Sequence, residues 1–193
     1  MLKRFAVIAF ACLLAACSLP ETRIYSLDMP HNKAAGNTKA VSSLTIHIDS
    51  PRYLDQPYIA HRNSRYSLII SKYSKWDTSP DDLVKETFRD ALSTSGLFRE
   101  VRLSHAVPTG FYLLAINLKK FELLDTAEGA SGEIEFDAAL FSPDGKELFR
   151  RTFSNKTKLD DGSFLSLANA LSRGLGEGVN EVISGISGVV PAL

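Results

Sequence analysis

Residues 111–124 read FYLLAINLKKFELL, and this run decides the fold. Apolar side chains occupy both alternating sets of positions along it, a pattern that favours a strand covered on both faces. We therefore predict that Phe111–Leu124 forms a long strand in the centre of a sheet.

The residues after this strand predict its continuation as an antiparallel meander. Residues 133–140 (EIEFDAAL) alternate between apolar and mostly acidic side chains, as in a strand with one solvent-exposed face. Pro143-Asp144-Gly145 has turn chemistry, and Leu148–Lys156 returns as the antiparallel partner.

Shorter strands are expected before residue 111. The alternation in residues 44–49 (LTIHID) predicts a half-buried strand with His47 on its polar face, ending near Pro51. Residues 58–61 and 66–70 flank a turn-prone segment and predict a hairpin.

The clearest helix begins at residues 79–82 (SPDD). Ser79 is a good N-cap, proline suits the first helical turn, and the two aspartates complement the helix dipole. Apolar residues then recur at helical spacing as far as Gly96, a natural terminator. Residues 97–103 follow as an edge-like strand.

A second amphipathic helix is expected over about residues 162–186, interrupted by Gly174, Gly176 and Gly178. Each costs about 1 kcal/mol relative to alanine in a helix interior. The glycines indicate a break in the helix or its close packing onto the sheet. Alternatively, the backbone of another subunit approaches there, so Gly174 and Gly178 are candidate partner-contact residues.

Composition limits the classes of function. The 193 residues carry 22 Lys+Arg and 22 Asp+Glu, so no broad electrostatic case for nucleic-acid binding exists. The length and the 45% hydrophobic content suit one globular domain.

The amino terminus has the pattern of a secretory signal. Lys3 and Arg4 precede the apolar run Phe5–Leu14, which is too short to cross a bilayer, and Leu14-Ala15-Ala16-Cys17 follows. This ending resembles the bacterial lipobox, which implies cleavage before Cys17, a lipid on Cys17 and acylation (palmitate) of the new amino terminus. The alternative is an ordinary secretory signal with an incidental cysteine.

These features divide the chain into three parts. Residues 1–16 are the expected lipoprotein signal peptide, residues 17–42 hold the lipidated Cys17, the tether and a first short strand, and residues 43–193 form the domain. The strand at residues 25–28 is expected to dock onto that domain. Ser18 after the cysteine favours sorting to the outer membrane, by resemblance to the rule of enteric-type bacteria.

The sequence shows no set of residues with the spacing of a catalytic or metal-binding site. The four histidines share no metal-binding spacing, Asp81 and Asp82 suit a helix first turn, and neither a phosphate loop nor a nucleophile elbow is present. No thiol remains beyond Cys17 after cleavage. We therefore expect no metal, no cofactor and no enzymatic activity.

Trp76 is the only tryptophan, in the run Tyr73-Ser74-Lys75-Trp76 before the first helix. It could pack onto the first turns of that helix as a hydrophobic staple. Alternatively, Trp76 and Tyr73 form an exposed aromatic anchor for a partner.

Several of these motifs together resemble a family. The lipobox, Tyr25-Ser26-Leu27, the tyrosine-rich hairpin ending in Lys75-Trp76, the Ser-Pro-led helix and residues 96–101 (GLFREV) are similar to the ABC-type transport auxiliary lipoproteins, which include paraquat-inducible protein C. Asp77 and the glycines near the C-terminus depart from the family pattern. The resemblance implies an α/β single domain, with two main helices against a mixed, mostly antiparallel sheet.

The resemblance also implies a function. Such a protein is a non-catalytic outer-membrane lipoprotein facing the periplasm, which works beside mammalian-cell-entry (MCE) domain proteins and, in many systems, an ABC transporter. The cargo of such a system is a lipid moved between membranes or, alternatively, a solvent or toxicant. Homo-oligomers are possible, and nucleic acid is not an expected partner. The alternatives are a structural or assembly lipoprotein of the outer membrane and, more remotely, a periplasmic hydrolase.

Overall fold

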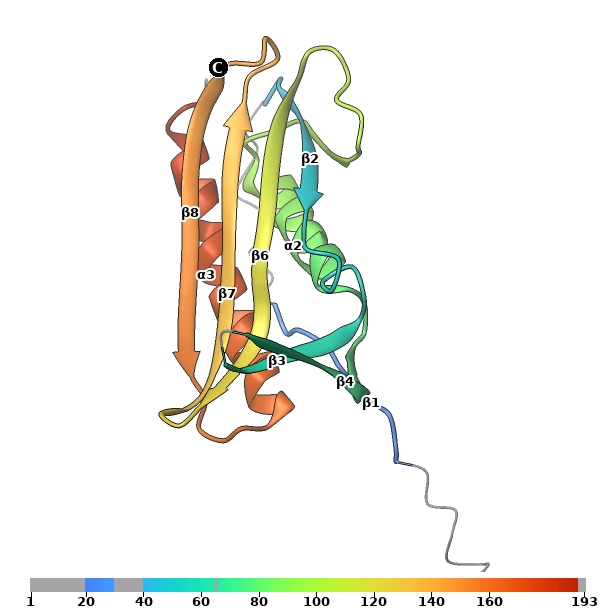
Figure 1. The fold of residues 1–193 in the computed structure, drawn as a ribbon. Helices are drawn as coiled ribbons and strands as arrows, with labels where there is room; N and C mark the ends of the chain where they lie inside the picture. The colour runs from blue at the N-terminus through green and yellow to red at the C-terminus, as the bar shows by residue number, and fades with distance from the viewer. Residues whose placement is uncertain (1–19, 30–39, 65, 191–193) are drawn as a thin grey trace, which may run out of the picture.

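A computed structural model describes residues 20–29, 40–64 and 66–190, so the expected signal peptide and Cys17 lie outside the described residues. The described chain forms one mixed eight-stranded sheet with two helices on one face (Figure 1), which confirms the α/β class. In chain order the elements are β1 (Arg23–Tyr25), β2 (Ser43–Asp49), β3 (Tyr58–Ser64), β4 (Ser67–Trp76), α2 (Pro80–Ser95), β5 (Glu100–Leu103), β6 (Phe111–Thr126), β7 (Gly129–Phe141), β8 (Glu147–Lys158) and α3 (Phe164–Ser187).

Strand β6 organises the sheet, as predicted. One of its edges pairs antiparallel with β7 along nearly its whole length. The other edge is shared, because Phe111–Asn117 pairs in parallel with β2 and Leu123–Leu124 pairs in parallel with β3. With 16 residues at a rise of about 3.3 Å, β6 is long enough for both neighbours.

The predicted meander β6–β7–β8 is confirmed, and Gly145 in its second turn has a φ of 83°, which glycine adopts without steric cost. The sheet is mixed: the long β6–β7 and β7–β8 pairs and the β3–β4 hairpin are antiparallel, whereas β1–β4, β2–β5, β2–β6 and β3–β6 are parallel. Strand β5 lies at an edge, as expected.

Strand β2 differs from its prediction. It is buried on both faces over most of its length, and Thr45, on the set of positions expected to be polar and exposed, is 0% exposed. The reason is its place in the sheet, because β2 lies between β6 and β5 while α2 packs against it. The alternation of apolar and polar residues along a strand does not indicate whether a helix covers its second face.

Helix α2 has the predicted ends. The Ser79 side chain accepts a hydrogen bond from the main-chain N–H of Asp82, and Gly96 terminates the helix with a φ of 75°. A hydrogen bond from Lys85 holds the pKa of Asp82 below its ordinary value. The buried face of the helix carries Val84, Phe88 and Leu92.

Helix α3 runs without a break through its glycines, so the expectation of a break is wrong and that of close packing is confirmed. A Cβ atom added at Gly178 would lie 2.8 Å from ring atoms of Phe136 and Phe153, and one added at Gly174 would lie 3.1 Å from Ile134. These two glycines let α3 lie close to β7 and β8.

The first short strand docks onto the domain, but it spans Arg23–Tyr25 rather than the expected residues 25–28. Strand β1 pairs in parallel with β4, with Arg23 opposite Ser74. The Tyr25 ring then meets Phe164 at the start of α3 edge to face, with the ring centroids 6.0 Å apart. The chain upstream of β1 therefore joins the domain at the β4 edge of the sheet.

Candidate functional site

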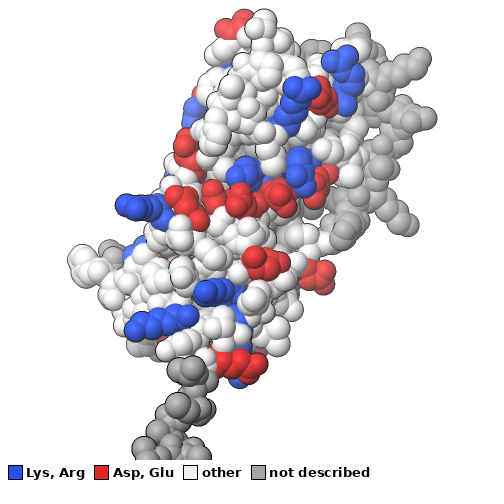
Figure 2. All heavy atoms as spheres, turned by 90° about the vertical axis from the view of Figure 1, so that its right-hand side faces the viewer, with Lys and Arg blue, Asp and Glu red and all other residues white. Residues whose placement is uncertain are grey.

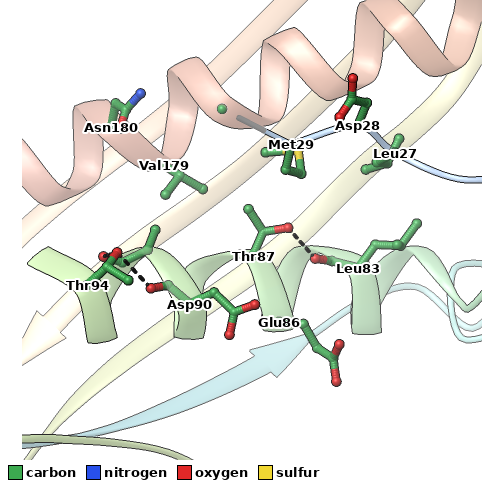
Figure 3. A pocket seen from close by; sticks show the side chains of 12 residues that line it. Leu27, Asp28, Met29, Leu83, Glu86, Thr87, Asp90, Thr94, Val179 and Asn180 are labelled. Carbon is green, nitrogen blue, oxygen red and sulfur yellow. Dashed lines mark hydrogen bonds between the residues drawn. The ribbon is translucent and has the colours of Figure 1, made fainter. Parts of the chain in front are cut away.

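A pocket of about 350 Å³ lies between α2 and α3 (Figure 3). It exists because both helices cover the same face of the sheet while the segment Leu27–Met29, just after β1, lies beside them. The main-chain N–H of Asp28 donates to the Ser172 hydroxyl at 3.1 Å, which holds this segment against α3. The pocket is lined by Leu27, Asp28, Met29, Leu83, Glu86, Thr87, Asp90, Ala91, Thr94, Gly176, Val179 and Asn180.

The lining combines apolar and acidic side chains. Glu86 and Asp90 are exposed and lie one turn apart on α2, at the edge of the pocket. Arg89 neutralises part of this charge, since it lies 3.7 Å from Glu86 and 2.8 Å from Asp90. The pocket therefore has an apolar wall with two partly neutralised acidic side chains at its edge.

The hydroxyl groups in the pocket are engaged with the backbone of α2. Thr87 donates to the Leu83 carbonyl at 2.7 Å, and Thr94 donates to the Asp90 carbonyl at 3.0 Å (Figure 3). No histidine, lysine or cysteine is among the described residues that line the pocket. Both threonine hydroxyls therefore donate to main-chain carbonyl oxygens rather than to a carboxylate that could act as a base.

The surface charge is mixed. Figure 2 shows a row of acidic side chains crossing the middle of one face, with basic side chains above and below it. Neither sign dominates this face, in keeping with the formal charge of zero.

One pair of histidines meets in space although their sequence spacing gives no hint of it. The rings of His47 and His105 contact edge to face with their centroids 5.4 Å apart, and His47 lies 3.5 Å from Asp49. Within residues 20–29, 40–64 and 66–190, no group of three or more His, Cys, Asp or Glu side chains could hold a metal ion.

Three of the candidate partner-contact residues are inside the fold. Trp76, the last residue of β4, is 2% exposed, and its ring meets Phe121 of β6 edge to face at 5.5 Å. Gly174 and Gly178 face the sheet. An exposed aromatic anchor at Trp76 and a subunit contact at the two glycines therefore do not fit this structure, because the chain's own core already covers these residues.

Tyr73 is the exception, with 47% of its surface exposed on β4. It lies next to Ser74, the partner of Arg23 in β1. Cys17, the predicted lipidation site, lies outside the described residues.

A buried ion pair was not predicted from the sequence. The Glu122 side chain on β6 is 0% exposed, and the Arg62 Nε atom on β3 lies 2.6 Å from its Oε1 atom. The Tyr53 hydroxyl donates to Oε2 at 3.1 Å. Burial, with the negative charge of Glu122, raises the pKa of Tyr53 to about 12. The only signal in the sequence is a carboxylate within the apolar run Phe121–Leu124.

Comparison with known proteins gives the family. The family model described as "ABC-type transport auxiliary lipoprotein component" matches residues 25–182, a stretch that includes every residue lining the pocket. The chain belongs to this family. The family is one of auxiliary components of ABC-type transport, and its members are lipoproteins. None of the curated proteins compared with the sequence matches it.

Solved structures agree on the fold. Protein XCC0632 from Xanthomonas campestris, assigned to DUF330, superposes with a TM-score of 0.72 at 21% identity, covering 86% of this chain and 96% of its own. An uncharacterized protein gives a TM-score of 0.67 at 17% identity, covering 86% of this chain and 99% of its own. The protein CT253 from Chlamydia trachomatis gives 0.51 at 10% identity, covering 80% of this chain and 100% of its own.

In the part of the chain that the structure describes, neither helix has the length and apolar character needed to span a membrane.

Proposed function

We propose that the protein is a lipid-anchored outer-membrane lipoprotein that faces the periplasm and serves an MCE/ABC-type system for moving lipids between membranes. It acts by binding other proteins, without catalysis. The observation that carries this proposal is the family match over residues 25–182, whose family is an auxiliary component of ABC-type transport. A lining without a nucleophile next to a base supports the same role.

The α2–α3 pocket is the proposed partner site. Its apolar wall would take an apolar segment of an MCE-domain protein, and Glu86 and Asp90 would meet basic residues beside that segment. At most about 20 Å of extended chain separates Cys17 from Arg23, so the partner must reach to this domain at its membrane.

Charge reversal in the pocket tests partner binding. We expect Glu86→Lys with Asp90→Lys to reduce several-fold the MCE-domain protein recovered with the tagged lipoprotein from detergent-solubilised membranes. Asp125→Lys with Glu128→Lys is the matched control, because these residues are also exposed acids but lie at the β6–β7 turn. Failure of the unmodified protein to recover any MCE-domain protein would contradict the transport role.

The same experiment distinguishes the transport role from the alternative of a structural or assembly lipoprotein. A structural or assembly lipoprotein would recover envelope proteins and no transporter component. Gene order discriminates as well, since neighbouring genes for an ABC permease, an ATPase and an MCE protein are expected only for the transport role.

The lipid anchor has its own test. We expect Cys17→Ser to abolish the lipid-dependent increase in mass and to remove the protein from the outer-membrane fraction, because the thioether-forming thiol is lost. Mass spectrometry and membrane fractionation measure both effects. A variant that still carries the mass of the lipid and still fractionates with the outer membrane would contradict the lipoprotein assignment.

A further inference from the structure

Exposed apolar side chains gather on β1 and the β3–β4 hairpin. Tyr66 is 98% exposed and Ile24 is 68% exposed, and Ile69, Ile70 and Tyr73 are exposed on β4. A patch of large apolar and aromatic side chains in one region marks an interaction surface.

The charge of the same hairpin is of one sign. Residues 58–76 include four Lys or Arg and no Asp or Glu. Arg62 is paired with Glu122, but Lys72 is exposed, and the Lys75 Nζ atom lies 5.0 Å from the centroid of the Tyr58 ring. The patch therefore combines tyrosines, isoleucines and positive charge.

The covalent path to the predicted anchor ends at this patch. Six residue steps join Cys17 to Arg23, a reach of at most about 20 Å. Arg23 pairs with Ser74, which is the neighbour of Tyr73. In Figure 1 the described chain before β1 leaves the molecule at the end where the hairpin lies.

We propose that the β1 and β3–β4 surface rests on an anionic phospholipid bilayer, the one in which the lipid on Cys17 is inserted. This inference rests on the proposed lipidation. Tyrosine side chains suit the membrane–water interface, isoleucines suit the acyl boundary, and lysines attract anionic headgroups. The contact orients the domain and leaves the α2–α3 pocket free for a protein partner.

The test uses the mature protein purified from membranes and reconstituted in vesicles of phosphatidylethanolamine and phosphatidylglycerol. A cysteine introduced by Tyr73→Cys carries an NBD fluorophore. The matched control is Val107→Cys, because Val107 is an exposed apolar residue just before β6 begins, at the end of β6 away from the β3–β4 hairpin. We expect blue-shifted emission with several-fold higher intensity at residue 73 and water-like emission at residue 107. The effect at residue 73 should weaken in phosphatidylcholine vesicles or at high salt.

A second variant ties the signal to the patch. Adding Ile70→Glu should return the emission at residue 73 to that of residue 107, with the fluorescence of buried Trp76 unchanged as evidence of a native fold. Water-like emission at residue 73 in protein that floats with the vesicles would overturn the bilayer contact while the anchor stands. A protein that does not float at all would instead contradict the lipidation. A signal lost when the protein is diluted in excess lipid would assign the patch to a second copy of the chain and overturn the proposal.

Discussion

Replacing Arg62 with methionine is expected to lower the free energy of unfolding by about 3–5 kcal/mol. The Glu122 side chain is 0% exposed, and Arg62 supplies its charge partner at 2.6 Å. Without Arg62, the carboxylate keeps the hydrogen bond from Tyr53 but has no opposite charge in a site closed to water. Urea denaturation followed by Trp76 fluorescence measures the change.

The double variant Arg62→Met with Glu122→Leu is the control. Replacing both partners of a buried ion pair with apolar residues is often neutral, so the double variant should recover most of the lost stability. A loss below about 1 kcal/mol in the single variant would mean that Glu122 finds other partners or water. The pair joins β3 to β6 where only two residues of each strand pair, so we expect it to position the β3–β4 hairpin.

Gly178→Leu is expected to lower the free energy of unfolding by about 3 kcal/mol, the upper part of the usual range for overpacking a core. A Cβ atom alone would lie 2.8 Å from Phe136 and Phe153, two stacked rings with centroids 5.2 Å apart. Neither ring can move without disturbing the other. Thermal unfolding should show the loss as a decrease in Tm of about 2–4 °C per kcal/mol.

Alanine at two neighbouring glycines provides a matched comparison. At Gly176 a Cβ would meet only the end of Met29 at 3.7 Å, so Gly176→Ala should stabilise the protein by up to about 1 kcal/mol through helix propensity. Gly178→Ala gains the same propensity but meets the rings, so it should destabilise the protein. Equal stabilisation by both variants would show that α3 does not lie as close to the sheet as described.

Local sequence signals predicted the elements well. The cap at Ser79, the stop at Gly96 and the Asp144-Gly145 turn depend on hydrogen bonds and backbone angles within a few residues, which a sequence displays directly. The long apolar run of β6 also indicated a central strand. These predictions are confirmed because their causes are local.

The candidate surfaces were harder to predict. The sequence left two interpretations of Trp76 open, a hydrophobic staple on the first turns of the helix and an exposed anchor, yet the residue that covers its ring is Phe121, 45 positions later. The α2–α3 pocket needs the segment Leu27–Met29 beside two distant helices, and no local pattern reports that arrangement. Tyr73 was the one predicted contact residue that the fold leaves exposed among those it describes.

By itself, the sequence determined the order and type of the elements, the lipobox-like pattern that predicts lipidation at Cys17, and the family resemblance, because periodicity, capping and motifs act along the chain. Only the tertiary structure decided that Gly174 and Gly178 of α3 pack against the sheet, that Glu122 pairs with Arg62, and that β2 is covered on both faces. Each of these depends on which segments become neighbours in space. Whether a side chain is buried depends on these spatial neighbours. Its charge and size indicate whether it tolerates burial, but they do not indicate which segment will cover it.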